Sequence, residues 1–330
     1  MKIVARDLLS MLPVLLLACA VVSSNSARAQ SYPAKPLRLV VPAAPGGVSD
    51  NSARALTQAL TPLIGQPILI ENRAGANGNI GAEACARAAP DGYTACFLQG
   101  VLVALNPLAY ANIPFDTERD FTPVVHVNWF DSSIVVNAAV PARSIRELVE
   151  LARNRPGTLN WGSLGSGSTS HLYMEWLQAK TGAVFNHIPY KGAPQLLLAA
   201  ATGEVQAMTN TPGTVLAHVK AGKLRVVAVI SGRTRTPLMP DIPTFQEQGY
   251  DLDFRNWNSI FFQRGVPPEA IRRLNTEANI VLRDPKFDER YFAPMATTAS
   301  GGSPEELAEI VRAARVTAAE LVKISKLRLD

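Results

Sequence analysis

The chain is poor in charge, histidine and cysteine. Charged residues make up 18% of its 330 residues, and only four histidines and three cysteines are present. The histidines form neither an H-x-x-x-H nor an H-E-x-x-H pair, and the sequence holds no Cys/His cluster, so we expect no metal site. The formal net charge of +5 is spread along the chain without a run of Lys or Arg, which argues against binding to nucleic acid.

Motifs for cofactors and nucleophiles are also missing. The glycine-rich stretches lack the G-x-x-x-x-G-K-[ST] pattern of a phosphate loop. Residues 165–170 read GSGSTS, which lacks the third glycine of a dinucleotide fingerprint. No serine of this stretch lies in a G-x-S-x-G nucleophile elbow, which counts against a serine esterase. We therefore expect no cofactor and no catalytic residue.

The N-terminus predicts a secretory signal peptide over residues 1–29. A positively charged start precedes an apolar run over 8–22, which is short for a membrane span, and ARA at 27–29 supplies an A-x-A cleavage signal. Cleavage before Gln30 would release the mature chain into the periplasm. Lipoprotein processing at Cys19 is the less favoured alternative.

Strand-like runs alternate with helical spacings in two blocks, and the length and 47% hydrophobic content suffice for two cores. Strands are expected at 37–41, 67–71, 93–98, 132–137, 158–161, 184–190, 204–209 and 224–231. Helices are expected at 49–64, 78–89, 144–154, 194–201 and 304–323, and from 168 and 267 onward. Such alternation predicts two α/β units with parallel sheets.

Each unit contains a strand that passes through a glycine-rich turn into a helix, at 42–50 and at 163–168. Ligands of open parallel sheets bind beyond the carboxyl ends of the strands. Helix N-termini there offer unpaired N–H groups and the positive end of a dipole. Serine hydroxyls and glycine backbone in the second turn suit a carboxylate held without a countercharge, so we predict that an acid group binds there.

Three features of these units have two readings each. Asp50 is either an N-cap or an acceptor for an ammonium group or an ordered water on the ligand. His171 either contacts the ligand or packs under the second turn and steadies it by hydrogen bonds, which we favour. Cys85 and Cys96 either form a disulfide between a helix and the next strand or stay as two small buried thiols, the favoured reading.

Several motifs occur in an order that resembles one known family. They are YPAKPLRLVVPAAPGGVSD, GQPILIENRAGANGNIGAE, ARAAPDGYT, NP with DFTPV, HIPYKGA, VKAGKLRVVAV and PDIPTFQEQGY. Together, from about residue 32 to the C-terminus, the chain resembles the Bug (Bordetella uptake gene) family of extracytoplasmic solute receptors, also called tripartite tricarboxylate transporter substrate-binding proteins. Each motif alone is modest, but the ordered set is highly specific.

The resemblance implies an α/β type II periplasmic-binding-protein fold, in which two lobes joined by crossover strands enclose the ligand. Residues 30–131 would form the first part of lobe 1, 132–254 would form lobe 2, and 255–330 would return to lobe 1. Family members capture small carboxylates, amino acids or aromatic acids between the two turns. The ligand-binding residues expected here are Ala43, Ala44, Gly47, Asp50, Gln99, Ser163, Gly165, Ser166, Gly167, Ser168 and Asn210.

The chain departs from the family pattern at three places. Ala43 stands where an aromatic residue is usual, and Thr209-Asn210 replaces the common Phe-Asp. The segment 262–265 reads FQRG in place of the usual Ala-Pro-Ala-Gly. Our hypothesis is a roomier, less acidic pocket that suits a larger or more anionic acid.

The resemblance implies a periplasmic receptor without catalysis, which binds a small carboxylate for uptake by a tripartite tricarboxylate-type membrane transporter, and we expect it to be a monomer. Two alternatives remain open. The first is a ligand sensor that serves a signalling partner. The second is an exported hydrolase that uses Ser168 and His171, which are three residues apart and could share a helix face, although no acid partner or oxyanion motif supports it.

Overall fold

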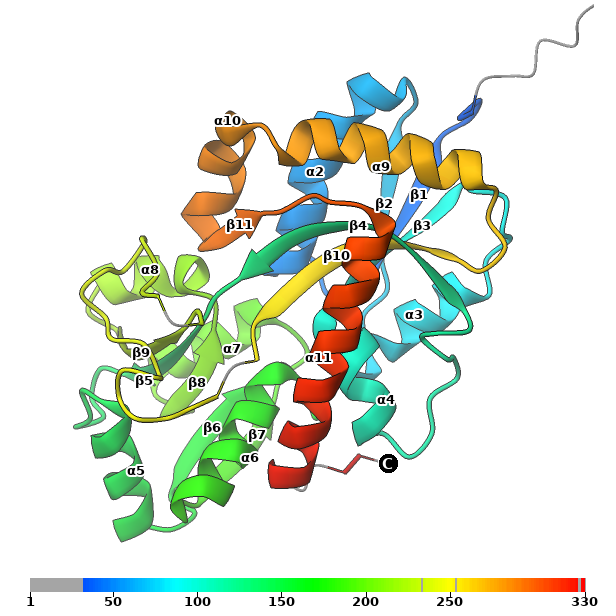
Figure 1. Ribbon diagram of the computed structural model, residues 1–330. Helices are drawn as coiled ribbons and strands as arrows, with labels where there is room; N and C mark the ends of the chain where they lie inside the picture. Colours follow the sequence, from blue (N-terminus) through cyan, green and yellow to red (C-terminus); the bar gives the residue numbers. More distant parts are fainter. Residues whose placement is uncertain (1–31, 233, 253, 326–327, 330) are drawn as a thin grey trace, which may run out of the picture.

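The structure, a computed structural model, describes residues 32–232, 234–252, 254–325 and 328–329. The signal peptide and the Cys19 alternative lie outside these residues. Two α/β lobes are stacked along the long axis of the molecule, and two long strands pass between them (Figure 1). This is the fold class that the resemblance implies.

Lobe 1 is built on a six-stranded sheet within the described residues. In spatial order its strands are β11 (Thr297–Ala299), β4 (Phe121–Phe130), β10 (Asn256–Gln263), β3 (Thr94–Gln99), β1 (Leu37–Val41) and β2 (Ile68–Asn72). Its helical segments are α2 (Val48–Ile64), η1 (Ala76–Gly78), α3 (Asn79–Ala86), η2 (Val101–Leu105), α4 (Asn106–Ala109), α9 (Pro268–Leu282), α10 (Pro285–Phe287), η3 (Asp288–Phe292) and η4 (Ala293–Met295).

Lobe 2 holds a five-stranded sheet in the described chain. Its order is β7 (Phe185–Pro189), β6 (Leu159–Ser163), β8 (Ala207–Asn210), β5 (Ser132–Asn137) and β9 (Leu224–Ile230). The helices around it are α5 (Ile145–Asn154), α6 (Thr169–Thr181), α7 (Ala193–Thr202) and α8 (Pro212–Lys220). The Ser144 side chain caps α5, the helix expected at 144–154, by accepting from the Glu147 N–H.

The last helix, α11 (Pro304–Ser325), runs along both lobes (Figure 1). It contacts β4 and η2 in lobe 1 and α6 in lobe 2. Ala318 and Leu321 of its C-terminal half belong to the same apolar core as Leu172 and Trp176 of α6. The segment 255–330 therefore packs on lobe 2 as well as returning to lobe 1.

The parallel pairing predicted from alternating strands and helices is confirmed at 37–98, but neither sheet is parallel throughout. Only β2-β1-β3 and β7-β6-β8 are parallel; β10 runs antiparallel to β3 and β4, and β5 runs antiparallel to β8 and β9. β4 and β10 are antiparallel because the chain leaves lobe 1 through β4 and comes back through β10. The strand-and-helix pattern did not locate β4, β10 or β11.

The prediction that Cys85 and Cys96 stay as two buried thiols is wrong, because the two form a disulfide. It joins the C-terminal part of α3 to the middle of β3, and both residues are fully buried. Eleven positions separate them in sequence. Small thiols and disulfide sulfurs bury equally well, so the sequence alone did not discriminate between the two readings.

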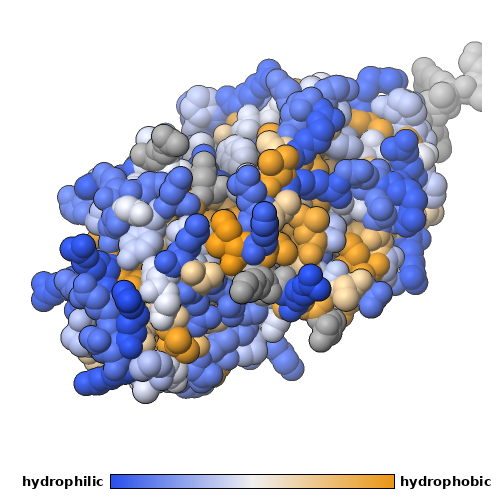
Figure 2. Space-filling view, turned by 60° about the horizontal axis from the view of Figure 1, so that its bottom comes forward, coloured by the Kyte–Doolittle hydropathy of each residue, from blue (hydrophilic) through white to orange (hydrophobic). Residues whose placement is uncertain are grey.

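The surface is mostly hydrophilic at both ends of the molecule, and apolar residues gather near the middle of the face in Figure 2. Single large apolar side chains are also exposed, among them Leu198 and Val316. Among the helices that the structure describes, none combines the length and the apolar character needed to span a membrane.

Candidate functional site

The two glycine-rich turns lie at the carboxyl edges of their sheets, each beside a neighbouring strand end. Val40 of β1 pairs with Cys96 of β3, so the first turn and Gln99 leave the sheet at the same edge. Gly162 of β6 pairs with Met208 of β8, which places the second turn beside Asn210 in the same way. The structure thus brings the predicted residues together as one turn and one amide side chain in each lobe.

The first turn is held by the Asp50 carboxylate. Asp50 Oδ2 accepts from the Gly46 N–H and from Arg54 Nε, both at 2.9 Å, and Oδ1 accepts from Asn72 Nδ2 at 2.9 Å. Burial raises the pKa of Asp50, but the hydrogen bonds from Arg54, Gly46 and Asn72 outweigh it, and the pKa lies below its usual value. Asp50 therefore stays ionised and braces the turn.

The N-cap reading of Asp50 is not what the structure shows. The N-cap of α2 is Gly47, and Asp50 is the third residue of the helix, from which its side chain reaches back to the Gly46 N–H. The same Asn72 amide also donates to the Ala43 carbonyl at 3.1 Å. Asp50 and Asn72 together fix the backbone on which half-buried Ala43, Ala44 and Gly47 lie.

Gln99 is tied to the first turn of α2. Its Nε2 donates to Ser49 Oγ at 2.5 Å, and Ser49 Oγ in turn donates to Asn258 Oδ1 at 2.7 Å. The Gln99 side chain is only half-buried, so one end is anchored while the residue borders the first turn. This is the place that a strand-end ligand contact requires.

The second turn is held by neutral groups. Ser163 is fully buried, its Oγ lies 2.6 Å from His187 Nε2, and it accepts from the Gly165 N–H at 3.1 Å. Burial, helped by the nearby His171, lowers the pKa of His187 to about 4. His187 is thus neutral at neutral pH, and Ser163 supports the turn from inside.

His171 packs under the second turn, as the favoured reading predicted. Its Nδ1 accepts from the Gly167 N–H at 3.1 Å, its Nε2 lies 3.4 Å from Glu175 Oε1, and its ring stacks on that of His187 with centroids 3.9 Å apart. The amides of Gly165 and Gly167 are therefore engaged within the turn. Ser166 is exposed, whereas Ser170 and His171 in the first turn of α6 are buried.

Ser168 is the N-cap of α6, and its Oγ accepts from the His171 backbone N–H at 3.4 Å. The His171 ring is turned to Gly167 and Glu175, so Ser168 and His171 are not arranged as a nucleophile and its base.

Asn210 carries a buried donor that is not used by the described part of the chain. Its Oδ1 accepts from the Thr211 N–H at 2.9 Å and from Thr214 Oγ1 at 2.8 Å. Its Nδ2 is buried and has no partner among the described residues. An unpaired buried donor is costly, so this one is suited to a ligand acceptor.

The lobes touch directly beside the turns. Asn77 Nδ2 donates to the Gly167 carbonyl at 2.8 Å, and Tyr110 OH donates to the Ser166 carbonyl at 3.1 Å. A Cβ placed on Gly192 of lobe 2 would lie 3.5 Å from the Ala44 Cβ. Each turn is therefore in contact with the opposite lobe.

The residues His187, Asn77 and Tyr110 were not predicted for the site. The motif HIPYKGA includes His187 and the motif GANGNIG includes Asn77, but nothing in their spacing shows a contact with a turn far away in sequence. Leu329 was also missed. It is pinned by backbone hydrogen bonds to Ala109 and Ala111, and its Cδ1 would lie 2.4 Å from a Cβ on Gly167.

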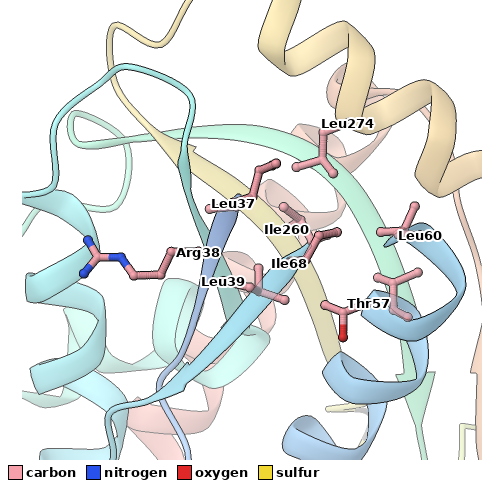
Figure 3. Close-up of a pocket in the computed structure, with 10 residues that line it drawn as sticks. Leu37, Arg38, Leu39, Thr57, Leu60, Ile68, Ile260 and Leu274 are labelled. Atoms are coloured by element: carbon pink, nitrogen blue, oxygen red, sulfur yellow. The ribbon is translucent and has the colours of Figure 1, made fainter. Parts of the chain in front are cut away.

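A separate apolar cavity lies inside lobe 1, between α2, α9 and the sheet (Figure 3). Leucine and isoleucine side chains such as Leu37, Leu60 and Ile260 surround it, and the Arg38 guanidinium points away from it to Glu71 and Thr94. It offers nothing to hold an acid group, so it is distinct from the site between the turns.

Two α/β lobes joined by crossover strands, each with a glycine-rich turn at the strand ends, define a type II periplasmic binding protein. Residues 52–304 match the family model described as tripartite tricarboxylate transporter family receptor. BugT of Bordetella pertussis is 34% identical over 82% of this chain and 83% of its own length. The chain therefore belongs to the tripartite tricarboxylate transporter receptor family, whose members are solute-binding receptors.

Solved structures agree. An R. palustris protein with adipate has a TM-score of 0.85 and 30% identity, and covers 90% of this chain and 99% of its own. MatC from Rhodopseudomonas palustris with bound malate has a TM-score of 0.82 and 25% identity, with coverage of 88% and 100%.

Proposed function

We propose that this protein binds a small dicarboxylate between the two turns and delivers it to a tripartite tricarboxylate-type transporter. The observation that carries the proposal is the buried, unpaired Asn210 Nδ2 beside the second turn. A carboxylate oxygen satisfies such a donor, and the N-termini of α2 and α6 add further N–H groups. The similar proteins with adipate and malate make a dicarboxylate the first class to test.

The short side chains of the first turn favour a ligand with some bulk. Ala43 and Ala44 have short side chains, and Ala44 faces Gly192, which has none. Asn210 is a neutral donor where the family commonly has an acid, so it attracts a carboxylate that an aspartate would repel. The residues proposed to border the ligand are Ala43, Ala44, Gly47, Gln99, Ser166, Ser168 and Asn210, with Asp50, Ser163, Gly165 and Gly167 bracing the turns.

A thermal-shift screen tests the proposal. The mature chain, unfolded and refolded to remove carried-over ligand, is heated with dicarboxylates, tricarboxylates, aromatic acids and amino acids. A ligand that binds only the native state raises the melting temperature. We expect a rise with adipate or malate and none with uncharged analogues. No rise with any acid would overturn the proposal.

We further propose that the receptor is exported to the periplasm by removal of residues 1–29 and acts as a monomer without catalysis. Mass spectrometry of the exported protein would show a start at Gln30, and light scattering would give the mass of one chain. A lipid-modified start at Cys19 or a stable dimer would contradict this.

A further inference from the structure

The crossover strand β10 carries two buried asparagines that reach the helices of both turns. Asn256 and Asn258 are two residues apart, so their side chains leave the same face of the strand, with Cα atoms about 7 Å apart. Asn258 is fully buried and Asn256 is 5% exposed. Buried amides of this kind are stable only when their donors and acceptors are paired.

Asn258 connects β10 to the start of α2. Its Oδ1 accepts from Ser49 Oγ at 2.7 Å, and its Nδ2 donates to Asn128 Oδ1 of β4 at 2.8 Å. Ser49 is the second residue of α2, directly after the first turn. Since the same hydroxyl accepts from Gln99, one amide of β10 holds both the helix start and the neighbouring strand end in place.

Asn256 makes the corresponding contacts in lobe 2. Its Oδ1 accepts from Thr169 Oγ1 at 2.8 Å, and its Nδ2 donates to Ser132 Oγ at 3.0 Å. Thr169 is the first residue of α6, directly after the second turn, and Ser132 is the first residue of β5. Each asparagine therefore bonds to one ligand-facing helix and to one position on the outgoing chain, Asn128 in β4 or Ser132 at the start of β5.

Trp257 fixes the strand between the two asparagines. Its side chain alternates to the opposite face of β10 and is 1% exposed. A Cβ on Gly100 would lie 2.5 Å from its indole ring, so the ring rests against the backbone directly after Gln99. β10 consequently has little freedom to slide or rotate relative to β3.

We propose that Asn256 and Asn258 are positioning residues that set the separation and orientation of the two ligand turns, and thereby the length of dicarboxylate that the receptor prefers. The inference rests on the proposed function for its ligand class. The two turns come from different lobes, and one short stretch of strand bonds to both of their helices. Small displacements of such anchors change which ligand fits a site of fixed geometry.

The first test compares dicarboxylates of increasing length. Binding of succinate, adipate and suberate is measured by calorimetry for wild type, Asn256→Ala and Asn258→Ala. We expect wild type to prefer one acid, and each variant to lose at least about tenfold in affinity for that acid while losing less for another length. Asn137→Ala is the matched control, because Asn137 bonds to the Ala200 carbonyl in lobe 2, away from the turns.

Milder variants remove the same bonds from the helix side. Thr169→Val and Ser49→Ala leave the asparagines in place, and a double-mutant cycle of Thr169→Val with Asn256→Ala should be non-additive if the bond carries the effect. Unchanged relative affinities for the three acids in all of these variants would overturn the inference, even where the proteins are less stable.

Amide hydrogen exchange of the ligand-free protein tests the same anchors without a ligand. Asn256→Ala should speed exchange at the start of α6 and leave the start of α2 unchanged, and Asn258→Ala should do the reverse. Equal exchange in wild type and variants at both helix starts would overturn the inference. A wild type that binds none of the acids would instead overturn the proposed function, and the exchange result would still decide whether the asparagines anchor the helices.

Discussion

The two lobes contain the same strand–turn–helix unit but hold its turn in place by different means. Lobe 1 holds its turn with the ionised Asp50 carboxylate, which accepts hydrogen bonds from Arg54 and Asn72. It also contains the disulfide between α3 and β3. Lobe 2 has no cysteine and uses Ser163 with neutral His187, whose ring stacks on that of His171. The difference teaches that the geometry of a ligand turn does not fix the chemistry that supports it, so the lobes should respond differently to the same disturbance.

The largest difference between the two lobes is expected when the disulfide is removed. The double variant Cys85→Ala, Cys96→Ala should lose about 3 kcal/mol of stability, because a short loop is no longer closed in the unfolded chain. Hydrogen exchange should show the loss at α3 and β3 and little change in lobe 2. A reducing agent should destabilise wild type but not the variant. Equal losses in both lobes would contradict the comparison.

A glycine in each turn gives the next test. Gly46 and Gly167 have φ of +83° and +80°, which strains any other residue, but only at Gly167 would a Cβ meet Leu329 and the Tyr110 hydroxyl. Gly46→Ala should cost about 1 kcal/mol and Gly167→Ala about 2 kcal/mol more, measured by denaturant unfolding. Adding Leu329→Ala should recover part of the second loss. Equal costs at the two glycines would show that Leu329 does not press on the turn.

Removing the side chain that braces each turn should lower the unfolding free energy by amounts that differ by about 1 kcal/mol. Asp50→Ala leaves the Gly46 N–H and the Asn72 amide without their acceptor and should cost about 2 kcal/mol. Ser163→Ala removes one neutral partner of His187 and Gly165 and should cost about 1 kcal/mol. Denaturant unfolding at neutral pH measures both. A larger loss for Ser163→Ala would reverse the assignment of the stronger brace.

The smallest difference expected between the two lobes is in how their stability depends on pH. The folded state holds the pKa of His187 at about 4, below its unfolded value, so its contribution to stability is present above about pH 6.5 and is lost as the pH falls toward 4. The pKa of Asp50 lies below its usual value, so the first turn keeps its contribution throughout this range.

Between pH 6.5 and pH 5, the unfolding free energy of wild type should therefore fall further than that of His187→Gln. The difference should stay below about 1 kcal/mol, because His187 is only half-buried. Unfolding free energies measured across this range check it. Burial also lowers the pKa of His126 to about 3, but His126 is common to both proteins and cancels in the comparison. Identical pH profiles would exclude His187 as the titrating group.

The sequence predicted the strand–turn–helix units well, because apolar runs, glycines and cap residues act locally. Ser144 and Ser168 are N-caps at the expected places. The strand-and-helix pattern missed the crossover strands, which the resemblance implied, for a physical reason: all of β10 is buried, so it shows no alternation, and β4 includes Pro123 and polar Asn128.

The supports of the site were harder to foresee. The contacts of His187 with Ser163, and of Asn256 with Thr169, join residues that only the tertiary fold brings together. The strand–turn–helix pattern located both turns, but it did not show that the Asp50 and Ser163 side chains are buried.

The central claim is that one acid is held by both lobes at once. The most direct measurement is a calorimetric titration of the refolded mature chain with the acid that gives the largest thermal shift, repeated for Gln99→Ala in lobe 1 and Asn210→Ala in lobe 2. The account predicts one ligand per chain and a loss of at least about tenfold in affinity for each variant. Affinity unchanged by either substitution, or no binding by the wild type, would contradict it.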